Sequence, residues 1–168
     1  SLAASLSSFR YQPAAVRLPQ GFEIYAMLRL LVRFAEARVR GEGLGSEQLH
    51  ELEPMLTADM LQDMLGALGR INLLHREESG QWLLSRDLAA VAMTEIYEAA
   101  GLRVPTREAN LPCRDDALGH AAEAALDALR LPLRQSLKRK LDTLFEPQQQ
   151  TPLCQPPSAS LCPRYGFH

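Results

Sequence analysis

The spacing of apolar residues changes sharply after Gly69, and this change constrains the fold more than any other feature of the chain. Before it, five apolar residues share one helical stripe at spacings of 1, 3, 1 and 3: Met60, Leu61, Met64, Leu65 and Leu68. After it, residues 71–74 and 81–84 are short apolar runs on either side of the polar loop 76–80, which ends in a glycine. This pattern is typical of a β-hairpin. The chain is therefore predicted to pass from helices into a small antiparallel hairpin.

Two further helices are predicted upstream of the stripe. The first opens after residues 19–21, and its apolar positions follow the i, i+3, i+4, i+7 rule: Ile24, Met27, Leu28, Leu31, Ala35 and Val39. The glycine-rich residues 41–45 end it. Ser46 is predicted to cap a short helix to about Leu52, and Thr57 to cap the stripe helix. Two short helices joined by a tight turn indicate a helix-turn-helix.

Three helices followed by a hairpin are in the order of a winged helix, which we predict for residues 19–101. A further short helix is expected from about Thr94 to Ala100, because Gly101 stops it. The predicted fold class is mainly α with a small β-hairpin: a winged helix-turn-helix plus a long C-terminal helix.

The long helix is expected within residues 102–146, after a connector broken by prolines. Asp115 and Asp116 lie where the dipole of a helix N-terminus favours acidic groups. Its apolar stripe consists of six leucines at spacings of 3, 4, 4, 4 and 3: Leu126, Leu129, Leu133, Leu137, Leu141 and Leu144. Because the stripe continues across Pro132, we expect one helix kinked at the proline. We predict that this stripe is an oligomer or docking face.

Both ends of the chain differ in composition from the middle. Residues 1–18 have few periodic apolar positions and are interpreted as a lead-in segment. Residues 147–168 hold five of the eleven prolines, so we predict a disordered tail. The chain starts at Ser1 without the charged region of a signal peptide, and its first methionine is Met27. We therefore expect a fragment of a longer protein.

The chain offers no motif for catalysis or metal binding. Its four histidines have no i, i+4 spacing, and its three cysteines form no CxxC pair. The adjacent carboxylates Glu77 and Glu78 lie on the expected hairpin loop, where neighbouring side chains point apart and cannot share a proton. We therefore predict no catalytic residue, no metal site and no cofactor.

Charge is unevenly distributed, although the net charge is only −2. Between residues 46 and 86, three arginines stand against seven acidic residues, a net charge of −4. The expected recognition helix offers Asp59, Gln62 and Asp63 in place of the basic side chains that usually contact DNA. DNA phosphates would be repelled by such a surface, so DNA is an unlikely partner and a protein–protein role is favoured.

Basic residues gather on both sides of this acidic segment. Residues 1–40 contain six arginines against two glutamates, and residues 130–140 add five basic residues. Each basic residue close to an anionic membrane leaflet contributes on the order of 1 kcal/mol of attraction, which makes anionic lipid headgroups an expected contact. The predicted membrane-proximal basic face consists of Arg10, Arg17, Arg29, Arg33, Arg134 and Lys138.

Four segments resemble a known family. Residues 1–13 (SLAASLSSFRYQP) resemble the segment that follows the last transmembrane helix of the YihY/BrkB family, bacterial inner-membrane proteins labelled ribonuclease BN. Residues 19–23 (PQGFE), 52–56 (LEPML) and 82–88 (WLLSRDL) resemble the longer proteobacterial members. The resemblance covers about residues 1–146 and leaves the proline-rich tail unmatched.

This resemblance implies a cytoplasmic domain of a multi-spanning inner-membrane protein, soluble by itself, whose membrane region precedes Ser1. The expected partners are that membrane region and a second copy of the domain. Our leading hypothesis is a non-catalytic interaction or assembly domain.

Two alternatives stay open. Residues 91–97 (VAMTEIY), followed by a long helix, resemble the Rrf2-type winged-helix DNA-binding regulators, although only Cys113 lies where those proteins have three clustered cysteines for an iron–sulfur cluster. The family label implies a tRNA-processing ribonuclease as the second alternative.

Overall fold

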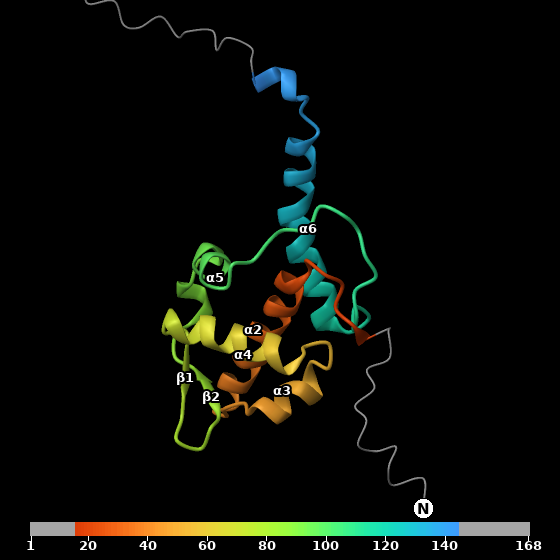
Figure 1. Ribbon diagram of the computed structural model, residues 1–168. Helices are drawn as coiled ribbons and strands as arrows, with labels where there is room; N and C mark the ends of the chain where they lie inside the picture. The colour runs from red at the N-terminus through yellow and green to blue at the C-terminus, as the bar shows by residue number, and fades with distance from the viewer. Residues whose placement is uncertain (1–15, 145–168) are drawn as a thin grey trace, which may run out of the picture.

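Helix α2 (Glu23–Val39) runs through the centre of the computed structural model, which describes residues 16–144 (Figure 1). Residues on nearly every side of its first half are buried: Ile24, Tyr25, Ala26, Met27, Arg29, Leu30 and Leu31. A helix buried on so many sides packs against several other elements and is not a surface helix with one apolar face. Helix α2 is therefore the core helix of the fold.

The predicted helix-turn-helix is present. Helix α3 (Ser46–Leu52) and helix α4 (Ala58–Arg70) are joined by a short turn. The Thr57 side chain accepts a hydrogen bond from the backbone N–H of Met60, which confirms the predicted cap of α4. The cap of α3 is Gly45, one residue before the predicted Ser46, and the Gln48 side chain accepts a hydrogen bond from the Gly45 N–H.

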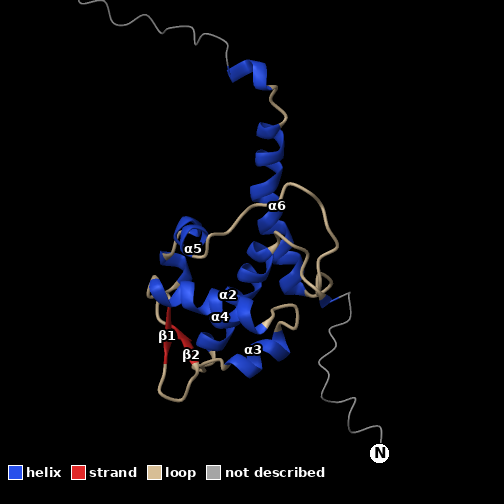
Figure 2. Ribbon diagram, in the orientation of Figure 1, coloured by secondary structure: helices blue, strands red, loops and turns tan. Residues whose placement is uncertain are grey.

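The hairpin follows α4 as expected (Figure 2). Strand β1 (Leu74–Arg76) pairs antiparallel with strand β2 (Trp82–Leu84), and Leu74 lies opposite Leu84. The loop after α2 adds a short third segment, because Leu44 and Trp82 exchange two backbone hydrogen bonds of 2.9 Å. Strand β1 begins later than predicted, since Asn72 takes a positive φ of 56° in the turn that closes α4. We call this hairpin the wing.

The C-terminal part of the described chain is helical again. A 3-10 turn, η2 (Leu88–Ala90), precedes helix α5 (Met93–Ala99), which begins one residue earlier than predicted. Helix α6 (Ala117–Leu137) then continues through Pro132, so the single helix expected across the proline is confirmed, whereas the bend angle stays a prediction. The predicted helix is too long at its far end: α6 ends at Leu137, and a separate 3-10 turn, η3 (Leu141–Leu144), follows.

One hydrophobic core joins the winged helix to the start of α6. The same cluster of buried side chains contains Phe22, Leu61 and Leu73 from the winged helix, and Ala122 and Leu126 from α6. The mainly α fold with a small hairpin and a long C-terminal helix is thus as predicted. Two predicted segments lie outside the described residues: most of the lead-in segment, which contains Arg10, and the proline-rich tail.

Candidate interaction surface

The start of α6 is fastened to α2 by a buried ion-pair network. Arg29, on α2, is fully buried and donates from Nη1 and Nη2 to the two carboxylate oxygens of Asp116, each at 2.9 Å. Its Nε and Nη2 donate to Glu53 at 2.7 and 3.2 Å, and Nη1 also donates to the Cys113 carbonyl at 3.0 Å. Arg33 adds a 2.9 Å bond to Glu53. We call Arg29, Arg33, Glu53 and Asp116 the Arg29 network.

The network shifts the pKa values of its members in the directions that an ion pair predicts. The hydrogen bond from Arg29 lowers the pKa of Asp116 to about 2, helped by the backbone N–H of Gly119. Burial alone would lower the pKa of Arg29, but its hydrogen bonds to Asp116 and Glu53 outweigh burial and raise that pKa above its ordinary value. Both groups therefore stay charged at neutral pH, and the ion pair joins a buried guanidinium to a carboxylate that is 45% exposed.

Asp116 has a second role at the beginning of α6. Its side chain accepts a hydrogen bond from the backbone N–H of Gly119, which makes it the N-cap of the helix. Gly119 packs tightly there, because a Cβ atom would lie 2.6 Å from the Cα of Arg114. The hydroxyl of Tyr25 donates to the Pro112 carbonyl at 2.9 Å, and burial raises the pKa of Tyr25. Together these contacts hold the connector and the first turn of α6 against α2.

The placement of Arg29 on an exposed basic face was wrong. Arg29 is fully buried, so its guanidinium lies in the interior, where the carboxylates of Glu53 and Asp116 compensate its charge. Arg33 is partly buried and paired with the same Glu53. Of the other residues assigned to that face, Arg17 and Lys138 are exposed, and Arg134 pairs with Glu108 at 3.1 Å.

Sequence reasoning missed the Arg29 network, although one signal was available. A charge that is preceded by Met27 and Leu28 and followed by Leu30 and Leu31 has apolar neighbours at every helical angle. Such a charge must be buried with a partner or break the apolar surface. The partner could not be named, because Glu53 and Asp116 are distant in the sequence.

The leucine stripe of α6 is divided between interior and surface. Leu126 is 1% exposed and belongs to the core, and Leu129 packs against the same core. Farther along, Leu133 is 36% exposed, Leu137 63% and Leu141 76%. Figure 1 shows the reason: the second half of α6 extends beyond the other helices. We call residues 131–144 the arm. The side chain of Leu144 is not among those described.

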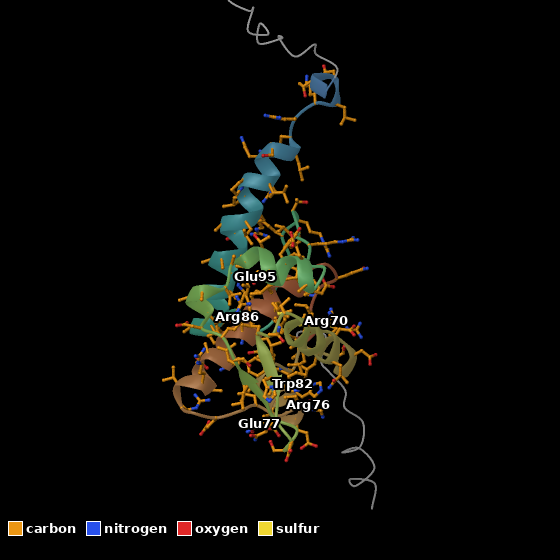
Figure 3. The ribbon with its side chains drawn as sticks, turned by 90° about the vertical axis from the view of Figure 1, so that its left-hand side faces the viewer. Arg70, Arg76, Glu77, Trp82, Arg86 and Glu95 are labelled. Atoms are coloured by element: carbon orange, nitrogen blue, oxygen red, sulfur yellow. The ribbon has the colours of Figure 1, made fainter. Side chains whose placement is uncertain are left out.

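The basic residues near α4 and the wing make contacts within the same chain (Figure 3). Arg70 donates to the Ala99 carbonyl at 3.1 Å, and Arg76 lies over the ring of Trp82 at 5.8 Å. Arg86 pairs with Glu95 at 3.1 Å, and this hydrogen bond lowers the pKa of Glu95. Every arginine of the acidic segment thus has an intramolecular contact. The expectation that DNA is an unlikely partner stays a prediction.

A hollow of about 420 Å³ lies beside α4, between that helix, the end of α5 and the start of α2. Its lining includes the apolar side chains of Met60, Met64 and Leu102 and the carboxylates of Glu23 and Asp63. A smaller hollow of about 260 Å³ shares Glu23 and Leu102 and continues it past the N-terminus of α2. We call the two together the α4 groove.

The rest of the described chain offers little chemistry. Between residues 16 and 144, no three His, Cys, Asp or Glu side chains are arranged to hold a metal ion. The His50 ring lies 3.3 Å from the Leu56 carbonyl, and His75 and His120 are exposed. Among the helices of this part of the chain, none combines the length and the apolarity needed to cross a membrane.

Comparison with known proteins finds close relatives. The chain is 57% identical over 145 residues to a UPF0761 membrane protein of Xanthomonas axonopodis pv. citri, a match that covers 86% of this chain and 34% of that protein. A UPF0761 membrane protein of Stenotrophomonas maltophilia strain K279a is 54% identical over 145 residues, which again cover 86% of this chain and 34% of that protein. Another, from strain R551-3, is 52% identical over 152 residues, 90% of this chain and 36% of that protein.

Neither family models nor solved structures add a further relative. No family model matches the chain, and no solved structure matches it. The chain spans 34–36% of the length of the relatives compared above. Its close homologues are UPF0761 membrane proteins, and it corresponds to about a third of such a protein.

Proposed function

We propose that this chain is a non-catalytic interaction or assembly domain of a multi-spanning bacterial inner-membrane protein of the YihY family, on the cytoplasmic side of the membrane. The names and lengths of the relatives support this placement, since they are called membrane proteins and the chain matches only 34–36% of them. The resemblance of residues 1–13 to the segment after the last YihY transmembrane helix also supports it.

The observation that carries the interaction role is the exposure of the arm. Leu133 and Leu137 are exposed on the part of α6 that extends beyond the core, and the exposed Leu141 follows on the separate turn η3. Single exposed leucines are ordinary, but three of them in one projecting segment form an apolar surface that association would remove from water. Burying one such side chain contributes about 1.5–3 kcal/mol.

Sedimentation of the purified 168-residue chain tests this role. We expect a reversible, concentration-dependent oligomer, and we expect the double substitution Leu137→Glu with Leu141→Glu to reduce it to a monomer. The matched control is Leu131→Glu, because Leu131 is also exposed but lies on the opposite side of α6. This control should associate like the original chain. A protein that stays monomeric at every concentration, with or without the substitutions, would refute the role.

A reporter fusion in the full-length protein tests the cytoplasmic placement independently. Green fluorescent protein joined to the C-terminal end of this chain should fluoresce, whereas alkaline phosphatase at the same position should be inactive, because its disulfides form only in the periplasm. The reverse result would place the domain outside the cytoplasm.

A further inference from the structure

The α4 groove has the chemistry of a helix-binding site. It combines apolar side chains, Met60, Met64 and Leu102, with the carboxylates of Glu23 and Asp63. Arg70 and Arg103 also line it, and the Arg70 guanidinium donates to the Ala99 carbonyl. Methionine side chains adapt readily to different apolar partners. An occupant that matches the apolar residues and the exposed Asp63 is an amphipathic segment with apolar residues on one side and a cationic residue beside them.

The groove is open because α4 has a glycine at the position that faces it. Gly66 lines the hollow, and a Cβ atom there would meet only the end of the Arg70 side chain, at 3.8 Å. A glycine inside a helix is less stable than an alanine there, and no close neighbour in this structure requires Gly66. The missing side chain instead gives a partner access to the α4 backbone.

The arm of this same chain has the matching chemistry. Its exposed leucines lie beside Arg134, Lys138, Arg139 and Lys140, and with Asp142 as the one acidic residue the arm has a net charge of +3. Residues 46–86, which contain α4 and the wing, have a net charge of −4, although one of the negative charges belongs to the buried Glu53, which Arg29 and Arg33 compensate. Opposite charges of this size favour encounter and orient the two surfaces.

The groove cannot receive the arm of its own chain. Helix α6 is continuous from Ala117 to Leu137, and Asp116 and Leu126 fix its first half against α2. From there the arm extends away from α4 (Figure 1). Any arm that occupies the groove must therefore come from another molecule.

We propose that the arm of one copy docks into the α4 groove of a second copy, with Leu137 and Leu141 against the methionines and Lys138 beside Asp63. The inference rests on the proposed function, and it deepens that function by naming the surface the leucines bind. Reciprocal exchange of two arms closes a two-fold dimer and leaves no unfilled groove. Docking also covers the α4 surface that a winged helix would otherwise present to DNA.

Charge reversal tests the contact between Lys138 and Asp63. Both residues are exposed, so reversing either charge should leave the fold intact. We expect Asp63→Lys and Lys138→Glu each to weaken the dimer by at least about tenfold in Kd. The matched control is Glu78→Lys, the same change of charge on the wing, outside the groove. It should dimerise as the original chain does.

Mixing the two charge-reversed chains distinguishes exchange between molecules from any other effect. In a mixed dimer each arm meets a groove of opposite charge, so affinity should return to within about threefold of the original. Failure of the mixture to recover would overturn the proposed contact.

A substitution that fills the groove provides a test without any change of charge. Gly66→Gln places a side chain in the hollow, and it replaces glycine by a better helix former, so folding should not suffer. We expect dimerisation to be lost while the thermal midpoint of the monomer is kept or raised. Unchanged dimerisation of this variant would overturn the inference.

Photo-crosslinking separates failure of this inference from failure of the proposed function. A photo-reactive amino acid at position 137 of the 168-residue chain should form links to α4 of the second copy, whereas the same group at exposed Gln135, on the other side of α6, should not. Links from arm to arm would overturn the groove contact and leave an interaction domain. A chain that never associates would overturn both.

Discussion

Arg29 and Asp116 form a two-point ion pair between positions 87 residues apart, with both nitrogen–oxygen distances at 2.9 Å. The arginine belongs to the core helix α2, and the aspartate caps α6. A bidentate pair fixes direction as well as distance, because the guanidinium plane and the carboxylate must align. The ion pair therefore holds the N-terminus of α6 against α2.

Removing the Asp116 side chain should destabilise the fold through two contacts at once. Asp116→Ala deletes the N-cap of α6 and one partner of the buried Arg29, and each loss costs about 1 kcal/mol or more. We expect the free energy of unfolding in urea to fall by about 1–3 kcal/mol. The neighbouring Asp115→Ala, at an exposed residue, is the control and should change it by less than about 0.5 kcal/mol. Equal losses would contradict the assigned role.

Asp116 should also make stability depend on acid pH. Hydrogen bonding to Arg29 lowers its pKa from 3.8 to about 2, so the unfolded chain binds this proton first as the pH falls. The stabilisation is fully present well above pH 3.8 and is lost as the pH falls towards 2. Urea unfolding between about pH 6 and pH 3 should show the gap between the original chain and Asp116→Asn narrowing on acidification. A constant gap would contradict the pKa shift.

Substitution of Glu53 should destabilise the fold more than substitution of any other member of the Arg29 network. It is fully buried and accepts from Arg29 and Arg33, so Glu53→Gln removes the carboxylate they share and leaves Arg29 with Asp116 and Arg33 with Glu36. Breaking a buried pair in this way costs about 3–5 kcal/mol. Thermal unfolding should show a large drop in midpoint, whereas Glu51→Gln, at an exposed position of α3, should show little change. Similar midpoints for both variants would mean that the interior tolerates the loss of the Glu53 charge.

Two helical glycines should respond to alanine in opposite directions. Gly66→Ala adds a methyl group whose nearest neighbour, the end of the Arg70 side chain, lies at an ordinary contact distance of 3.8 Å, and it should stabilise by about 0.5–1 kcal/mol. Gly119→Ala would place Cβ 2.6 Å from the Cα of Arg114, so the start of α6 must shift and stability should fall. Urea unfolding of the two variants checks both signs, and a stabilised Gly119→Ala would mean that the connector yields easily.

The two halves of the leucine stripe should differ in their contribution to folding. Leu126→Ala removes a core side chain and should cost about 2–5 kcal/mol, whereas Leu137→Ala, in the exposed arm, should cost less than about 0.5 kcal/mol in the monomer. Unfolding measured at low protein concentration excludes any contribution from association. Comparable losses at both positions would mean that the arm packs against its own domain.

The order of elements could be predicted because each is encoded in a few neighbouring residues. Thr57 caps α4 through its own side chain, and Gly80 takes the positive φ of 87° that the hairpin loop needs. Asp116 begins α6 as the acidic pair suggested. Local signals of this kind do not depend on what packs against them.

The candidate surface could be predicted only in part. The spacing of Leu126 and Leu137 assigns them to one stripe, but spacing cannot tell where along that stripe the supporting helix α2 ends. The fate of Arg29 depends on Glu53 and Asp116, which only the tertiary fold brings together. The α4 groove has no local signal except Gly66, since α5 and the start of α2 complete it.

Pro132 lies close to the point where α6 passes from the core to the arm. Proline has no N–H to donate to the carbonyl four residues earlier, that of Ala128, so the helix is least stiff at this turn. Bending of α6 should therefore concentrate at Pro132, while the first half of the helix stays packed against α2. The arm can therefore make small adjustments of direction towards a partner while Asp116 and Leu126 hold the first half of α6 in place.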